Sequence, residues 1–236
     1  MEEHWQGMVH NRTSQNNFSM GKGDTNLKIT NTRVYGLEES VYASRYPMTA
    51  KAPTEEQFKQ DIIDIFTLQG ECRYEGTDIF ELSPHFKRAK KLARAKSGSG
   101  HDCFLKGIIV QCDIHAPQYF WQQWQRYHFA DIISSQSKMH CITKMDIEQC
   151  VMNPVMYMSR ECAKDAIGLY KAEEFDIDEC LANIPLGLEY TARVTMNYLQ
   201  LKSMYKQRKT HRSKQWKEYC TWIESLPYAK EFIIGE

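Results

Sequence analysis

The stretch "CFLKGIIVQCDIHAPQYFWQQWQRYHFADIISSQSKMH", residues 103–140, carries the clearest fold signals in the chain. Its first part, residues 103–116, is mostly apolar and predicts a buried strand. Pro117 then suits the first turn of a helix, where the backbone N–H is unpaired in any case. We therefore predict a helix that begins at Pro117 and extends over residues 117–140.

The predicted helix brings together groups that suit a flat ligand. Trp124 and Arg126 are an aromatic ring and a guanidinium, and they stand beside Tyr127 and His128. Such groups stack on planar rings. The residues alone favour an ordinary core helix with satisfied polar tips over such a site. The "SSQSK" run, residues 134–138, offers donors for a phosphate, although a polar turn has the same composition.

Apolar periodicity and capping residues predict one further strand and a series of helices. The strand covers 27–37, and the helices cover 37–48, 54–69, 81–97, 145–185, 186–212 and 213–232. The segment 145–185 is helical in pieces, with a break at Asn153–Pro154. The "SGSGHD" run over 97–102 reads as a loop, whose glycines either turn the chain or let its backbone approach a ligand. We predict one α+β domain over 27–236, after a polar arm at 1–26.

The predicted 186–212 helix ends in basic residues, as the helix dipole favours. Spacings of four, three and four residues place Asn197, Leu201, Met204 and Arg208 on one face of it. Arg208 either pairs with a surface acid or binds a phosphate or carbonyl oxygen there. From the spacing alone, pairing with a surface acid is the favoured role.

Composition limits the class of protein. The 236 residues include 30 basic and 30 acidic side chains, and 42% are hydrophobic, as in globular proteins. A net charge of zero and the lack of any apolar run of about 18 residues predict neither nucleic acid nor membrane as partner. Because residues 1–26 contain no hydrophobic leader, we expect a cytoplasmic protein whose eight cysteines are reduced and mostly structural.

Several reaction classes lack their sequence signature. The chain contains no C-x-x-C or H-E-x-x-H motif, so we expect no metal site. It also contains no P-loop, no dinucleotide fingerprint and no G-x-S-x-G elbow. These absences disfavour a zinc protease, a P-loop enzyme and a serine hydrolase.

Over about residues 27–226 the chain resembles the flavin-dependent alternative thymidylate synthases. Three blocks in the family's order carry the resemblance: "SGSGHDCFLKGIIVQCDIHAPQYFWQQWQRYH", "SSQSK" and "IPLGLEYTARVTMNYLQLKSMYKQRKTHRSKQWKEY". The matching positions are Gly100, His101, Asp102, Ala116, Pro117, Gln123, Trp124, Arg126, Pro185, Leu186, Thr195, Asn197, Arg208, Gln215 and Trp216.

The resemblance implies a fold, a reaction and a set of site residues. The fold is that of the thymidylate synthase-complementing proteins, an α+β fold with a small mixed or antiparallel sheet flanked by long helices, in a homotetramer with shared active sites. The reaction makes dTMP from dUMP, methylenetetrahydrofolate and NADPH with bound FAD. Arg208 would hold and polarise the pyrimidine as the catalytic residue. FAD would be bound by His101, Cys103, Arg126, Tyr127, His128 and Asn197, and the nucleotide by Gln123, Ser134, Ser135, Ser137, Lys138 and Arg208.

The chain departs from the family pattern at several of these positions. The family signature is Arg-His-Arg, seven residues, then Ser; here Tyr127 and His128 follow Arg126, and Gln136 stands at the serine position, one residue before Ser137. Ser134 replaces a glutamate, Cys103 a threonine and Leu199 an arginine. Two other functions therefore remain open: a related flavin enzyme that modifies another pyrimidine nucleotide, for example by hydroxymethylation, and a non-catalytic nucleotide-binding protein.

Overall fold

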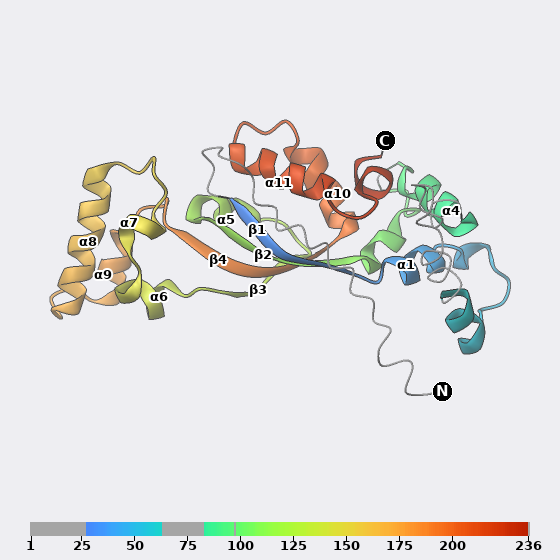
Figure 1. Cartoon of the computed structure of the whole chain (residues 1–236), viewed down its shortest axis with the longest axis horizontal. Helices are drawn as coiled ribbons and strands as arrows, with labels where there is room; N and C mark the ends of the chain where they lie inside the picture. The colour runs from blue at the N-terminus through green and yellow to red at the C-terminus, as the bar shows by residue number, and fades with distance from the viewer. Residues whose placement is uncertain (1–26, 63–82, 97, 236) are drawn as a thin grey trace, which may run out of the picture.

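A four-stranded antiparallel sheet in the order β1-β2-β4-β3 forms the centre of the molecule (Figure 1). The structure is a computed structural model that describes residues 27–62, 83–96 and 98–235. The strands are β1 (Lys28–Tyr35), β2 (Ile109–Pro117), β3 (Ala130–Ser135) and β4 (Glu189–Asn197). The predicted α+β class with a small antiparallel sheet is confirmed. The predicted arm at 1–26 lies outside the described residues.

The two faces of the sheet differ in chemistry because side chains alternate along each strand. β2 and β4 pair over their whole length, from Ile109 opposite Asn197 to Pro117 opposite Glu189. Cys112, Ile114, Val194 and others of one face are buried in the main hydrophobic core. The opposite face is polar, and there Arg193 on β4 donates to Asp113 on β2 at 3.1 Å.

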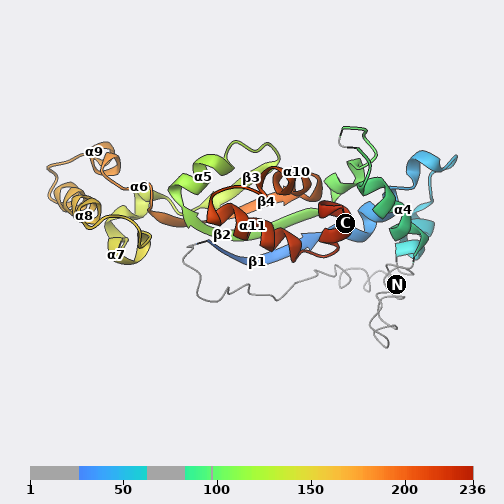
Figure 2. The same ribbon diagram turned by 90° about the horizontal axis from the view of Figure 1, so that it is seen from above.

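Three helices cover the apolar face of the sheet (Figures 1 and 2). They are α5 (Gln118–Trp124), α10 (Tyr198–Arg208) and α11 (Lys214–Glu224). Their inward faces join one aromatic cluster, in which Phe120 lies 4.7 Å from Trp216 and Tyr219 lies 5.1 Å from Trp124 between ring centroids. Burial of these large rings is the main stabilising contribution at this layer.

Smaller helical units flank the sheet at its two ends. One end holds α6 (Lys138–Cys141), α7 (Ile147–Cys150), α8 (Tyr157–Lys171) and α9 (Ile177–Ala182), packed around a second hydrophobic cluster. The other end holds α1 (Leu37–Ala43), α4 (Pro84–Ala93), helical residues 55–62, a short 3-10 helix (Tyr46–Met48) and a C-terminal π-helix (Lys230–Ile234). The predicted pieces of 145–185 and the Ser83–Pro84 helix start are confirmed.

Two predicted helices are wrong in part because a strand occupies part of each. The predicted 186–212 helix is strand β4 followed by helix α10, and the predicted 117–140 helix ends at Trp124, before strand β3. In β4 the residues "YTARVTM" alternate apolar and polar with a period of two, which the helical reading overlooked. Between α5 and β3, Phe129 adopts a left-handed φ of 61°, which turns the chain back along β4.

A smaller correction concerns the predicted strand over 103–116. A 3-10 helix occupies Cys103–Gly107, and β2 begins only at Ile109. Of the predicted helix over 54–69, residues 55–62 are helical and the remainder lies outside the described residues. In the described part of the chain, no helix combines the length and apolarity needed to cross a membrane.

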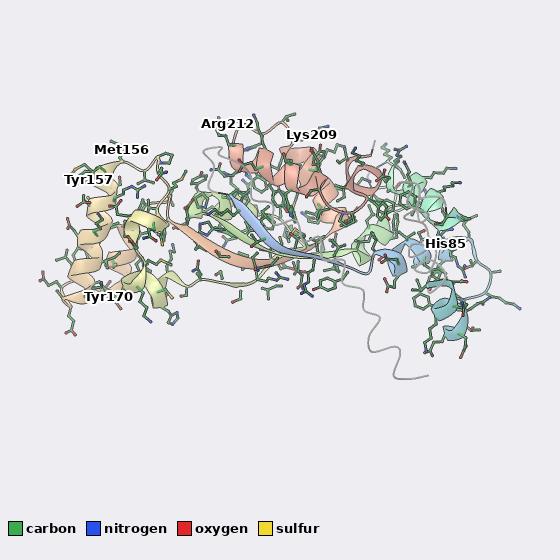
Figure 3. All side chains as sticks on the ribbon, in the orientation of Figure 1. His85, Met156, Tyr157, Tyr170, Lys209 and Arg212 are labelled. Carbon is green, nitrogen blue, oxygen red and sulfur yellow. The ribbon has the colours of Figure 1, made fainter. Side chains whose placement is uncertain are left out.

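His85, labelled in Figure 3, belongs to a half-buried cluster between α1 and α4. Its ring stacks on Tyr42 at 5.5 Å, and the Arg45 guanidinium covers the Tyr42 ring at 4.2 Å. Tyr42 donates to the Asp61 carboxylate at 2.7 Å, and burial with this bond raises the pKa of Tyr42 to about 12. Burial, and then the charges of Arg88 and Arg45, lower the pKa of His85 below its usual value.

We expect this cluster to make stability depend on pH in the mildly acidic range. Folding favours neutral His85, whose Nδ1 can accept from Arg88 at 3.2 Å. The unfolded chain therefore binds more protons at this residue, and its contribution, complete above pH about 6.5, is lost as pH falls through the lowered pKa. Urea unfolding of the wild type and of His85→Gln between pH 7.5 and pH 5 tests this. An equal pH slope in both proteins would contradict it.

Candidate functional site

Arg208, the last residue of α10, is held by two aromatic side chains. Its Nε donates to the Tyr127 hydroxyl at 2.6 Å, and its guanidinium carbon lies 4.2 Å above the Trp216 ring. The indole face attracts the guanidinium charge. Within the described part of the chain, neither terminal nitrogen of Arg208 has a hydrogen-bond partner. The guanidinium is therefore fixed in orientation while its outer N–H groups remain available to a ligand oxygen.

Trp216 connects Arg208 to Gln123. The indole is fully buried, and its Nε1 donates to Gln123 Oε1 at 2.8 Å. The Tyr127 ring meets the same indole edge-on at 5.9 Å. Four elements thus meet here: α5 supplies Gln123, the turn after it Tyr127, α10 Arg208 and α11 Trp216. The structure brings three of the predicted site residues, Gln123, Tyr127 and Arg208, into one group, which we call the Arg208 group.

We expect Tyr127→Phe to weaken this group without unfolding it. The change removes the acceptor for Arg208 Nε and the hydroxyl's donation to Gln207 at 3.2 Å, but leaves the ring against Trp216. A hydrogen bond to a charged group contributes about 1.5 kcal/mol, so the turnover number should fall about tenfold. The rate on dUMP, the substrate that the family resemblance implies, and the circular dichroism spectrum should be measured together. Unchanged turnover would show that Tyr127 does not orient Arg208.

The predicted nucleotide-binding run lies at the other end of α5. Lys138 donates to Gln118 Oε1 at 2.8 Å, and burial lowers the pKa of this lysine. Ser137 caps α6 by accepting from the His140 N–H, and its hydroxyl lies 2.8 Å from His140 Nδ1. Ser134 and Ser135 are exposed on β3. The run thus presents hydroxyls and an ammonium at the start of α5 and α6.

Gln136, which stands at the family's serine position, has a different task here. Its side-chain oxygen accepts from the Thr191 N–H at 2.8 Å, and its own N–H donates to the Thr191 carbonyl at 3.0 Å. These bonds extend the pairing of β3 with β4. Ser137, one residue later, is therefore the better placed of the two to meet a ligand.

The predicted flavin-side residues His101, Cys103 and Asn197 lie near the start of α10. Asn197 caps that helix by accepting from the Gln200 N–H at 2.9 Å. Between exposed His101 and Cys103, buried Asp102 pairs with Lys202 at 2.7 Å and anchors the loop to α10. Gly98 and Gly100 have φ values of 85° and 79°, and no other described atom lies within 4 Å of a Cβ added at either, so these glycines serve the turn.

One chain does not bring all the predicted residues together. Asn197 and Arg208 stand at opposite ends of α10, and a helix of eleven residues is about 16 Å long. The nucleotide run and the Arg208 group stand at opposite ends of α5, about 10 Å for seven residues. The predicted shared helical face of Asn197 and Arg208 is wrong, because Asn197 ends strand β4 and serves as the N-cap of α10.

The turn between α5 and β3 carries the remaining predicted cofactor residues. Arg126 and His128 are exposed, and neither has a hydrogen-bond or ion-pair partner among the described residues. Phe129 beside them is 73% exposed. A guanidinium, an imidazole and a flat apolar ring therefore face solvent together. In contrast, Tyr127 turns inward onto Arg208 and Trp216.

Sequence reasoning gave no site role to Trp216, Gln118 or Gln136. Their roles depend on partners far along the chain: Trp216 bonds Gln123 across 93 positions, and Gln136 bonds Thr191 across 55. Of these three residues, only Trp216 had a local signal in the sequence, because it is a large aromatic residue close to a run of basic residues. Among the described residues, no three His, Cys, Asp or Glu side chains gather as a metal ion would need.

Comparison with family sequence models and with curated proteins finds no match. Comparison with solved structures shows the fold of the flavin-dependent thymidylate synthases. Two structures of ThyX from Helicobacter pylori with FAD and dUMP match at a TM-score of 0.60, with 13% and 12% identity, over 87% and 88% of this chain and 96% of those chains. A UMP/dUMP methylase, PolB from Streptomyces cacaoi with 5-Br dUMP, matches at 0.55 and 12% identity over 89% of this chain and 95% of that chain. At such identities the likeness establishes the fold.

Proposed function

We propose that this chain is a flavin-dependent enzyme that modifies the pyrimidine ring of a uridine nucleotide. In its specific form, the proposal is reductive methylation of dUMP to dTMP with methylenetetrahydrofolate and NADPH. The observation that carries it is Arg208, oriented by Tyr127 and Trp216 with its outer N–H groups available. The structures of similar fold bind FAD, dUMP or 5-Br dUMP.

Arg208 supplies the main electrostatic contribution in this proposal. A planar guanidinium can donate two N–H groups to a pyrimidine carbonyl and stabilise negative charge that develops on the ring. Arg208 does not need to reorient during the reaction, because the Trp216 face and the Tyr127 hydroxyl already hold its guanidinium. Gln123 supports this arrangement through the Trp216 indole.

The exposed side chains fit the chemistry of FAD. Arg126 and His128 would meet the negative diphosphate, and Phe129 offers a flat apolar surface beside them. His101, Cys103 and Asn197 would line the flavin side from a neighbouring subunit, since α10 separates them from Arg208 within one chain. When bound, FAD would supply the transfer of the one-carbon unit and the hydride.

The nucleotide phosphate would be met by the run at the start of α6. The Ser137 hydroxyl and the Lys138 ammonium are the donors, with Ser134 and Ser135 beside them. Burial lowers the pKa of Lys138, and a bound phosphate would restore the preference for the charged form. The separation of this run from Arg208 favours a homotetramer in which subunits share each site.

A cofactor and product assay tests this function. Purified protein should be yellow, or should become so with added FAD, and should convert dUMP to dTMP when methylenetetrahydrofolate and NADPH are supplied. The same gene should rescue a host that requires thymidine. Colourless protein that does not take up FAD would overturn the proposal.

A related flavin enzyme that modifies a different uridine nucleotide is a second candidate. The replacement of the family's histidine and arginine by Tyr127 and His128 favours it, together with the likeness to a UMP/dUMP methylase. Assays with UMP beside dUMP, followed by mass spectrometry of the base, distinguish the substrates and separate a methyl from a hydroxymethyl product. Nucleotide binding without flavin would instead indicate a non-catalytic binding protein.

A further inference from the structure

The turn between α10 and α11 concentrates positive charge beside the Arg208 group. The segment "KQRKTHRSKQWK", residues 206–217, contains six lysines and arginines and one histidine, but no acid. The whole chain has a net charge of zero, so this charge is a local feature. We call these residues the basic turn: Lys206, Arg208, Lys209, His211, Arg212, Lys214 and Lys217.

Little within the described part of the chain neutralises the basic turn. None of its residues forms an ion pair with a described acid. Glu218, the next acid along the chain, keeps its Oε2 buried, and Glu224 accepts from Tyr205 at 2.8 Å. Burial lowers the pKa of His211, and the positive charges of Arg208 and Arg212 lower it further.

The exposed cations of the basic turn face outward from the candidate site. Lys209 and Arg212 are exposed, and Figure 3 shows both on the outer side of α10 and α11, away from the sheet. Arg208, only one residue before Lys209, remains half-buried against Trp216. A ligand that reaches Arg208 from solvent therefore passes a surface of unpaired cations.

We propose that the basic turn binds the anionic remote end of a co-substrate whose reactive ring enters the Arg208 group. The ligand chemistry is a chain of phosphate or carboxylate groups. Two sources fit it, namely the phosphates of a reduced pyridine nucleotide and the glutamate tail of a folate. The inference rests on the proposed function, because that function brings both molecules to this site. Exposed cations attract such groups over about one Debye length, roughly 8–10 Å in physiological salt.

A small polyanion fits the observations better than a nucleic acid does. Binding to a polynucleotide draws on many phosphate contacts spread over a long surface. Here the unpaired cations lie within one turn, and the net charge of the chain provides no wider positive field. We therefore make oligonucleotide binding one outcome of the test.

Titration calorimetry of the full-length protein tests the proposal with Lys209→Glu/Arg212→Glu. Two ligand pairs differ only in remote charge: NADP+ with NAD+, which carry the phosphates of the reduced nucleotides but cannot reduce the flavin, and a polyglutamylated folate with its monoglutamate. We expect the double change to lower the affinity for the more charged member of one pair by about tenfold at low salt. The reason is that two cations that attract the ligand's anionic groups become two carboxylates that repel them. The pair that responds identifies the source.

Lys87→Glu/Lys91→Glu on α4 is the matched control, since it makes the same charge change at exposed positions on another part of the molecule. Its affinities should equal those of the wild type, and both variants should bind dUMP as the wild type does. Equal affinities in all three proteins for both pairs, or no binding of either pair, would overturn the inference. So would tighter binding of a single-stranded oligonucleotide than of any co-substrate. Because binding is measured without turnover, failure of dTMP formation is a separate result.

Discussion

Arg208→Ala should lower the rate of nucleotide turnover by about two to three orders of magnitude, the cost of removing a preorganised donor to developing negative charge. The fold should persist, because Arg208 is only half-buried and is the last residue of α10. Turnover should be compared with wild type by quantifying the nucleotide product, and the fold by circular dichroism and urea unfolding.

Two further variants make the Arg208 result interpretable. Arg208→Lys keeps the charge but loses the planar fork and its stacking on Trp216, so most of the loss should remain. Arg94→Ala removes an exposed arginine just after α4 and should leave turnover unchanged. Wild-type turnover in Arg208→Ala would remove this residue from the mechanism and leave the proposed function without its central group.

Trp216→Ala should cause the largest loss of stability. The indole is fully buried, lies 4.7 Å from Phe120 and 5.5 Å from Tyr219, and donates to Gln123. Truncation of a buried tryptophan removes its packing and leaves a cavity, so the free energy of unfolding should fall by about 3–5 kcal/mol. Urea unfolding at constant temperature measures this directly.

A conservative variant separates the two roles of Trp216. Trp216→Phe keeps much of the packing against Phe120 but loses the donor to Gln123 and the larger face beneath Arg208. We expect a smaller loss of stability and a clear fall in turnover in the folded protein. Equal fractional losses of stability and turnover would mean that Trp216 acts through packing alone.

Local signals in the sequence were sufficient for several elements. Ser83 and Pro84 start α4 as predicted, with Ser83 accepting from the Phe86 N–H. The break at Asn153–Pro154 separates α7 from α8 as predicted. These features depend on residues within one or two turns of each other, so their physical cause is present in the sequence itself.

The strand–helix boundaries could not be placed in the same way. Residues 186–212 satisfy a helical spacing and also a period of two, and only pairing with β2 and β3 selects the strand over Glu189–Asn197. Likewise, β3 extends the sheet edge after the left-handed turn at Phe129. Tertiary hydrogen bonds thus decided where periodicity was ambiguous.

By itself, the sequence determined several helix starts and breaks, the aromatic residues of the core and Arg208 as a candidate site residue. The tertiary structure alone decided what holds Arg208 in place, since the bond to Tyr127 spans 81 positions and the bond from Trp216 to Gln123 spans 93. It also decided that Gln136 pairs with the sheet edge while Ser137 caps α6. The reason is physical: the orientation of a side chain depends on packing partners that only the folded chain brings within contact distance.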